Sequence, residues 1–302
     1  MDLSVVVPLL DEQESVIALI QAVRAALEKD YAYELVLVDD GSTDATVEKV
    51  SSHQDPAVKL VSLNRNYGQS IAMLAGIDHA KADYIVTLDG DLQNDPKDIP
   101  RMMQMLHEQG VDVVVGARSK RQDNWFRTFP SWCANRLIVW MTGVNVKDAG
   151  CTLKVFRQDV AKNLGLFGTL HRFIPVLSKL YGARIVEMDV AHHPREHGES
   201  KYVSGLLNGV AGRTFAVLCD LLLLLYLQKF ALKPMHLFGG VGLILLAFSL
   251  LVLFLHTWVS ACMVAIFGVQ CVFLGLIAEV LMRNYYHVEN RGPYVVREVL
   301  TK

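Results

Sequence analysis

The sequence predicts an α/β fold with a mostly parallel sheet, followed by a segment anchored in a membrane. Over roughly the first 120 residues, short runs rich in Val, Ile and Leu alternate with amphipathic stretches, the pattern of β-α units around a parallel sheet. Polar loops follow several of these runs. The membrane segment is predicted because residues 234–278, a run of 45, contain no Lys, Arg, Asp or Glu.

The predicted strands are apolar runs bounded by turn residues, at 4–8, 34–39, 58–63, 84–89 and 111–116. Amphipathic stretches predict helices at 14–28, 43–52, 69–81 and 97–109. Beyond Arg118 we expect a helix at 128–142 and strands at 152–156 and 184–190. In open parallel sheets, ligands bind beyond the C-terminal ends of the strands. We therefore expect three loops that follow strands to meet at one site, namely 8–12, 39–44 and 89–93.

The uncharged run is too long for one membrane crossing and suits two helices of about 20 residues each. We expect a transmembrane hairpin at 234–282, with helices at about 235–256 and 259–281. Lys229 and Lys233 precede the hairpin and three Arg residues follow it, which predicts that both ends face the cytoplasm. A pair of buried helices in a soluble core is the alternative.

The remaining segments are a globular domain at 1–202, a connecting segment at 203–233 and a cytoplasmic C-terminal tail at 283–302. The connecting segment is apolar but interrupted by Arg213 and Asp220, so we expect interfacial amphipathic helices lying on the membrane. A third crossing within 206–230 is the competing interpretation, and it would place the two termini on opposite sides. The first residues lack a basic n-region, which predicts a strand and not a signal peptide.

Charge is unevenly distributed, although the formal net charge is only −2. Residues 1–112 contain 8 Lys or Arg and 20 Asp or Glu, whereas residues 113–184 contain 12 and 3. An acidic half that can hold cations is therefore followed by a basic half that can hold anions. The five Cys residues show no C-x-x-C spacing, which argues against a disulfide framework and a zinc site. Without a zinc-finger or aromatic-interleaved basic pattern, nucleic acid is not expected as a partner.

The most informative motif is an Asp-x-Asp at the end of the predicted strand 84–89. Asp89 and Asp91 put two carboxylates at a strand end, and Gln93 adds an amide oxygen nearby. Mg²⁺ and Mn²⁺ prefer oxygen ligands and leave positions open for phosphate oxygens, so these three residues are candidate metal ligands. The alternative is a turn that caps a helix near Pro96.

A second acidic motif, Asp39-Asp40-Gly41-Ser42, follows the predicted strand 34–39 and opens a helix. Two Asp residues at a strand end can accept hydrogen bonds from a nucleoside base or from ribose hydroxyls, and Glu12 could serve the same pocket. Helix capping is the alternative for both, because Ser and Asp are favoured at helix starts.

Together with Pro8, the motifs at 39–44, 64–68 and 89–93 resemble glycosyltransferase family 2. The later motifs at 116–118, 171–175 and 195–202, with the terminal hairpin, are similar to polyprenyl-phosphate glycosyltransferases of the dolichol-phosphate mannose synthase type. The resemblance implies a GT-A fold and an inverting transfer of one sugar from a nucleotide-sugar donor to a polyprenyl phosphate.

The resemblance also implies roles for individual residues. Asp39 would lie near the nucleotide base, and Asp89, Asp91 and Gln93 would form the site for Mg²⁺ or Mn²⁺. The segment 195–202 is similar to the family's flexible loop that closes over the donor diphosphate. The donor-binding residues expected on this basis are Pro8, Leu10, Glu12, Asp39, Asp40, Ser42, Asn66, Gly68, Asp89, Gly90, Arg195 and Lys201.

A phosphate monoester is already ionised near neutral pH, its second pKa being about 6, so a lipid-phosphate nucleophile needs positioning more than a general base. Arg118 follows a predicted strand, and Arg127 and Ser131 lie one helical turn apart, so we expect these three residues to hold the acceptor phosphate. We take Arg118, with Asp89 and Asp91, as the catalytic set. The alternative is that the three acceptor residues face solvent or lipid headgroups.

We therefore predict a metal-dependent polyprenyl-phosphate glycosyltransferase of a bacterial inner membrane, with its catalytic domain and both termini in the cytoplasm, acting in cell-wall or lipopolysaccharide glycosylation. Two alternatives are a processive membrane polysaccharide synthase, disfavoured because no Gln-x-x-Arg-Trp motif occurs, and a non-catalytic membrane protein that binds nucleotide sugars. The sequence leaves open the sugar, UDP or GDP as its carrier, undecaprenyl or dolichyl phosphate as acceptor, and whether a homo-oligomer forms.

Overall fold

The structure is a computed structural model of the whole chain. It describes residues 1–118, 144, 146–148, 150–166, 168, 170–194, 294 and 296–301, together with 13 separate positions between 219 and 284. The chain divides into two compact units, one formed by Met1–Val210 with Pro293–Lys302 and the other by Ala211–Gly292. The predicted helix at 128–142 and most of the predicted hairpin lie outside the described residues.

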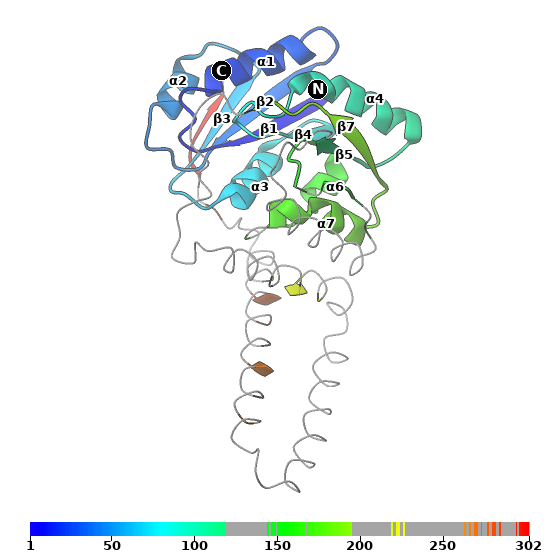
Figure 1. Ribbon diagram of the computed structural model, residues 1–302. Coiled ribbons are helices and arrows are strands. Elements are labelled where there is room, and N and C mark those ends of the chain that lie inside the picture. Colours follow the sequence, from blue (N-terminus) through cyan, green and yellow to red (C-terminus); the bar gives the residue numbers. More distant parts are fainter. Residues whose placement is uncertain are drawn as a thin grey trace, which may run out of the picture. The chain divides into compact units, whose positions relative to one another are not determined.

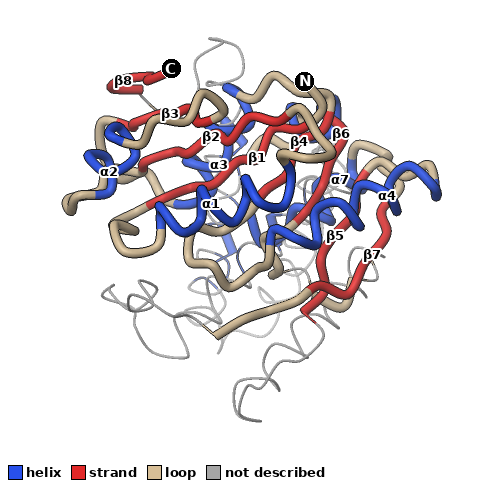
Figure 2. The backbone as a smooth tube through the Cα atoms, turned by 90° about the horizontal axis from the view of Figure 1, so that it is seen from above, coloured by secondary structure: helices blue, strands red, loops and turns tan. Residues whose placement is uncertain are grey.

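The first unit is built on an eight-stranded sheet with the order β7-β5-β6-β4-β1-β2-β3-β8. Figure 1 shows the unit from the side, and Figure 2 labels its strands. Strands β6 and β8 run antiparallel to their neighbours, and the other adjacent strands pair in parallel. This confirms the predicted mostly parallel sheet. The strands are β1 Leu3–Leu9, β2 Tyr33–Asp39, β3 Val58–Leu63, β4 Tyr84–Thr87, β5 Val113–Arg118, β6 Lys154–Arg157, β7 Ile185–Val190 and β8 Val296–Thr301.

Helices cover both faces of this sheet (Figures 1 and 2). Helices α1, α2 and α4 lie on one face, and α3, α6 and α7 lie on the other. Burial on both faces explains why the strands are almost continuously apolar instead of alternating with polar residues. The helices are α1 Val16–Leu27, α2 Thr46–Ser52, α3 Gln69–His79, α4 Ile99–Gln109, α6 Gln158–Lys162 and α7 Ile174–Leu180, with short 3-10 helices η1 Pro96–Asp98 and η2 Leu170–Phe173.

Side chains of β1 alternate between the two faces of the sheet and so pack against both layers of helices. Val5 and Val7 are fully buried in the core cluster that includes residues of α1 and α4. Val6 points to the opposite face, toward α3, where a Cβ at Gly76 would collide with its side chain. A glycine at this position therefore lets α3 lie directly against β1, since any larger residue would push the helix away.

Strand β8 corrects the prediction for residues 283–302, which the sequence analysis assigns to a C-terminal tail without a strand. It pairs antiparallel with β3, with Leu60 opposite Leu300 and Val61 opposite Val299. Tyr294, just before β8, donates a hydrogen bond from its hydroxyl to Asp78 at 2.9 Å. The last residues of the chain thus complete the sheet of the first unit.

Among the residues that the structure describes, no helix combines the length and apolar character needed to cross a membrane.

Candidate active site

Three strand-end loops meet at the C-terminal edge of the sheet, as predicted. The loop after β1 bonds to the loop after β2, because the Asp11 N–H donates to Ser42 Oγ at 2.8 Å and Asp11 Oδ1 accepts from the Thr43 N–H at 2.7 Å. The loop after β4 packs on the end of β1, since a Cβ at Gly90 would lie 2.6 Å from Leu9 Cδ2. Glycine at this position allows the Asp-x-Asp loop to lie close to the loops after β1 and β2, which are predicted to bind the nucleotide.

Asp40 has a structural role at this edge. Its buried carboxylate accepts backbone N–H bonds from Tyr67 at 2.7 Å and Gly68 at 2.9 Å, and so joins the loop after β2 to the loop after β3. Burial raises the pKa of Asp40, and the two N–H donors oppose this effect. Gly41 completes the junction: its φ is +78° and a Cβ would lie 2.7 Å from backbone atoms of Arg65 and Asn66, so only glycine fits.

Asp39 is the better candidate for contact with a ligand. It is buried, and one carboxylate oxygen accepts the Ser42 N–H at 3.2 Å. Within the described part of the chain, Oδ2 has no hydrogen-bond partner, so it can accept a bond from a nucleoside. Glu12, by contrast, accepts the Ser15 hydroxyl at 2.7 Å, which fits the alternative role at a helix start.

Asp89 is partly buried two residues beyond β4, between two side chains that donate to it. Thr152 Oγ1 donates to Oδ2 at 2.6 Å, and Gln69 Nε2 donates to Oδ1 at 2.8 Å. Thr152 Oγ1 in turn accepts from Asn94 Nδ2 at 3.1 Å, which leaves its hydrogen for the carboxylate. Burial and, to a lesser extent, the charge of Asp91 raise the pKa of Asp89 to about 6, and the hydrogen bond from the Thr152 hydroxyl limits this increase. Thr152, Gln69 and Asn94 were not predicted, because they come from three separate segments and carry no motif of their own.

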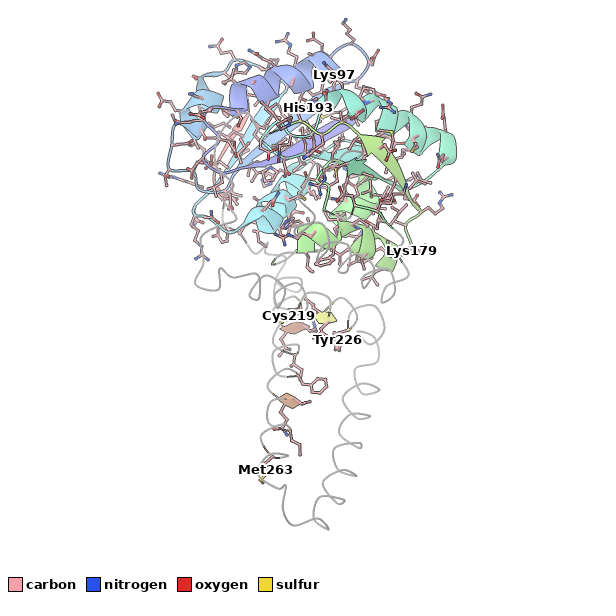
Figure 3. All side chains as sticks on the ribbon, viewed as in Figure 1. Lys97, Lys179, His193, Cys219, Tyr226 and Met263 are labelled. Carbon is pink, nitrogen blue, oxygen red and sulfur yellow. The ribbon has the colours of Figure 1, made fainter. Side chains whose placement is uncertain are left out.

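Asp91 and Gln93 continue the loop beyond Asp89. Asp91 Oδ1 accepts the Gln93 N–H at 3.2 Å. The Gln93 carbonyl accepts the His193 N–H at 2.7 Å, and the Gln93 side-chain amide donates to the His193 carbonyl at 3.5 Å. These bonds tie the loop to the segment after β7. Lys97 and His193, labelled in Figure 3, both contact Asp95 of the same loop, through the Lys97 N–H at 3.0 Å and His193 Nε2 at 3.4 Å.

Asp89, Asp91 and Gln93 fit a hard divalent cation. Burial and the neighbouring Asp91 both disfavour the charged form of Asp89, so a cation at this place would relieve excess negative charge. The amide oxygen of Gln93 adds a third oxygen donor, the element that Mg²⁺ and Mn²⁺ prefer. Within the described ranges, no three His, Cys, Asp or Glu side chains gather into a metal-binding group.

Arg118 ends β5 and forms a two-point ion pair with Asp148. Its Nε donates to Asp148 Oδ2 at 2.6 Å and its Nη2 donates to Oδ1 at 2.8 Å. The bond to Asp148 raises the pKa of Arg118, and the charge of Asp89 adds to this effect. A second cation, Lys154, is buried behind the site with a lowered pKa and donates to the Cys151 carbonyl.

The other predicted residues divide into those the structure places at the same edge and those it does not describe. Pro8 lies in β1 opposite Val38, and Asn66 Oδ1 accepts the Gly68 N–H at 3.0 Å in the loop after β3. Leu10 directly follows β1. The predicted acceptor residues Arg127 and Ser131, and the predicted diphosphate contacts Arg195 and Lys201, lie outside the described residues and stay predictions.

A mostly parallel sheet with acidic strand-end loops and an Asp-x-Asp just beyond β4 fits a nucleotide-sugar-dependent transferase of the GT-A type. The family model described as Glycosyl transferase family 2 matches residues 4–165. The chain belongs to this family.

Two relatives match almost the whole chain. Dodecaprenyl-phosphate galacturonate synthase of Rhizobium johnstonii is 41% identical over 99% of this chain and 93% of its own. Undecaprenyl-phosphate 4-deoxy-4-formamido-L-arabinose transferase of Edwardsiella ictaluri is 37% identical over 98% of this chain and 94% of its own.

Solved structures show the same fold at low identity. Glucosyl-3-phosphoglycerate synthase from Mycobacterium tuberculosis, in complex with Mn²⁺, UDP-glucose and phosphoglyceric acid, has a TM-score of 0.54 at 16% identity, covering 74% of this chain and 79% of that chain. S. aureus TarS 1–349, in complex with UDP-GlcNAc, has a TM-score of 0.52 at 16% identity, covering 78% and 76%. These likenesses support the predicted GT-A-type sheet.

Proposed function

We propose that this glycosyltransferase moves one sugar from a UDP- or GDP-sugar to a polyprenyl phosphate, with inversion at the anomeric carbon. The observation that carries this proposal is the similarity to two polyprenyl-phosphate transferases along nearly the whole chain, including the segment after residue 202. The acidic edge around Asp39 and Asp89, next to the cationic Arg118, supports it, because a donor and an anionic acceptor need opposite charges side by side.

In this proposal, an oxygen of the lipid phosphate attacks C1 of the sugar while the nucleoside diphosphate leaves. The phosphate is largely ionised at pH 7, so the protein contributes orientation and not proton removal. Asp39 would accept a hydrogen bond from the nucleoside, and Arg118 would hold the acceptor phosphate near the sugar. Asp89, Asp91 and Gln93 would hold Mg²⁺ or Mn²⁺, which stabilises negative charge on the leaving diphosphate.

We also propose that the enzyme acts at the cytoplasmic face of a bacterial inner membrane, anchored by a hairpin within 234–282. Strand β8 supports an even number of crossings: both ends of the unit Ala211–Gly292 connect to the first unit, whose sheet contains β1 and β8. If this segment crosses a membrane, it must return to the side from which it left. The alternative with a third crossing does not meet this condition.

The test uses the purified full-length chain in detergent, with radiolabelled UDP- and GDP-sugars, polyprenyl phosphate and Mn²⁺. A donor panel of hexoses, hexuronic acids and formamido-pentoses is scored by mass spectrometry of the lipid fraction. The proposal expects a lipid carrying one sugar. Polymer would instead identify a processive synthase, and nucleotide-sugar binding without product would identify a non-catalytic binding protein.

A further inference from the structure

We propose that Asp148 is a positioning residue that holds the Nε side of the Arg118 guanidinium, so that the Nη1 end is presented to the acceptor phosphate. The inference deepens the proposed function and rests on it for the identity of the acceptor. Asp148 belongs to none of the motifs on which the resemblance to the family rests.

The geometry of the guanidinium carries the first step. Asp148 occupies Nε and Nη2, the two donors on the side of the guanidinium. The group has five N–H donors in a rigid plane, so this bond leaves the second hydrogen of Nη2 and both hydrogens of Nη1 at the end of the side chain. In the described part of the chain, Nη1 has no hydrogen-bond partner. One arginine can therefore bind a carboxylate at its side and a phosphate at its end simultaneously.

The backbone that carries Asp148 is held by the strand next to β5. Glu187 Oε1 accepts the N–H of Lys147 at 2.7 Å and the N–H of Asp148 at 3.3 Å. Glu187 lies in β7, where it pairs with Val115 of β5, the strand that Arg118 ends. The loop that carries Asp148 is thus attached to the same two strands as the arginine, and the pair forms a closed unit with little freedom to rotate.

The Arg118–Asp148 pair is largely buried and closely packed, which restricts it to one geometry. Asp148 is 7% exposed and the Arg118 side chain is 19% exposed, so solvent screens the pair weakly. Gly150 lies against it: a Cβ there would stand 3.3 Å from Arg118 Nη2 and 3.5 Å from Asp148 Oδ1. A long arginine side chain that is ordered before the ligand arrives loses less conformational entropy on binding, which favours capture of the phosphate.

The test compares Asp148→Asn with the full-length wild-type protein. Asparagine keeps the shape but removes the charge and one of the two acceptor oxygens, so the guanidinium is free to rotate. We expect kcat/KM for polyprenyl phosphate to fall roughly 10- to 100-fold, while KM for the nucleotide sugar changes less than about threefold. Asp112→Asn is the matched control, because Asp112 pairs with Arg184 at 3.3 Å at the opposite end of β5 and β7. The control should leave both parameters unchanged.

A double-mutant cycle separates positioning from fold stabilisation. If Asp148 acts through Arg118, then Arg118→Ala with Asp148→Asn is no worse than Arg118→Ala alone. Additive losses, an equal loss in the donor KM, or no loss in Asp148→Asn would overturn the inference. Gly150→Ala is a second variant in case Asp148→Asn folds poorly: its methyl group crowds Arg118 Nη2 without changing charge, and a several-fold loss confined to the acceptor is expected. No acceptor-side loss in this variant counts against the inference.

Binding of farnesyl phosphate without donor distinguishes failure of the inference from failure of the proposed function. Wild-type binding that weakens in Asp148→Asn, while UDP binding stays constant, supports the inference even if no sugar transfer is found. Sugar transfer that is unaffected by Asp148→Asn refutes the inference alone. A wild-type protein that binds no polyprenyl phosphate refutes both.

Discussion

Replacing Asp89 by Asn is expected to stabilise the metal-free protein, and to do so more at pH 8 than at pH 5. The reason is the burial that raises the pKa of Asp89 to about 6 from 3.8. A raised carboxyl pKa means that the folded state holds the proton more tightly than the unfolded state. The stability that comes from this proton is present below pH 4 and is lost as the pH rises through 6.

The size of the effect follows from the shift in pKa. A difference of about 2 units corresponds to about 3 kcal/mol of free energy of unfolding at high pH. About half of it, on the order of 1.4 kcal/mol, develops between pH 5 and pH 8. The first unit has about 220 residues. For that size, 1 kcal/mol moves the melting temperature by about 2–4 °C, so the gap between Asp89→Asn and wild type should widen by about 3–6 °C.

Asparagine can take over the local hydrogen bonds, because its oxygen can accept from Gln69 and its amide can donate to Thr152. The variant therefore removes a charge with little change in shape. The assay is thermal melting by circular dichroism, with EDTA, in one detergent at both pH values. Asp112→Asn is the control: contacts with Arg184 lower the pKa of Asp112, so its contribution is complete by pH 5 and adds no change up to pH 8. A gap for Asp89→Asn that stays constant or narrows from pH 5 to pH 8 would refute the reasoning.

Four further predictions concern the same domain. Asp91→Ala should abolish turnover without lowering the melting temperature, and near-normal rates at saturating Mn²⁺ would contradict its place in the metal site. Thr152→Val removes the hydroxyl that opposes the raised pKa of Asp89, so the acid limb of the pH–activity profile should move to higher pH. Gly41→Ala should cost about 1–3 kcal/mol and raise KM for the nucleotide sugar, measured by melting and initial rates, with an unchanged KM as the opposing result. Deleting residues 296–302 exposes the edge of β3 and should cause aggregation in size-exclusion chromatography, whereas a monodisperse protein would argue against β8 as a required strand.

Much of the fold could be predicted because local pattern and tertiary structure agree in the β-α units. The predicted strand at 58–63 matches β3 at both ends, and the helix predicted at 69–81 starts at the first residue of α3. Predicted and observed helix boundaries differ where a side chain bonds to backbone groups near the helix start. Asp44 accepts both the N–H and the hydroxyl of Thr46, so α2 starts three residues later than predicted. Strand β8 was missed because its partner β3 is more than 200 residues away, and a pattern within one segment does not report such pairing.

The candidate site also contains residues that the sequence predicts and residues that only the structure reveals. Asp39, Asp89 and Asp91 could be predicted because strand ends and carboxylates are visible in the sequence. The partners that set their chemistry could not: Gln69 and Thr152 reach Asp89 from segments 20 and 63 residues away. Asp148 is a similar case, since it reaches Arg118 from 30 residues further along the chain. Spacing predicts which residues can react, whereas the fold determines which neighbours orient them.

Strand β8 also constrains the order of events during synthesis. The preceding strand of the sheet ends at Val190, so 105 residues separate the two, and the sheet cannot be completed until β8 at Val296–Thr301 has been synthesised. At about 5–20 residues per second, β3 waits with an unpaired edge for about 5–20 s after β7 has been made. An unpaired strand edge can pair with other chains, so β3 is exposed to aggregation until β8 has been made.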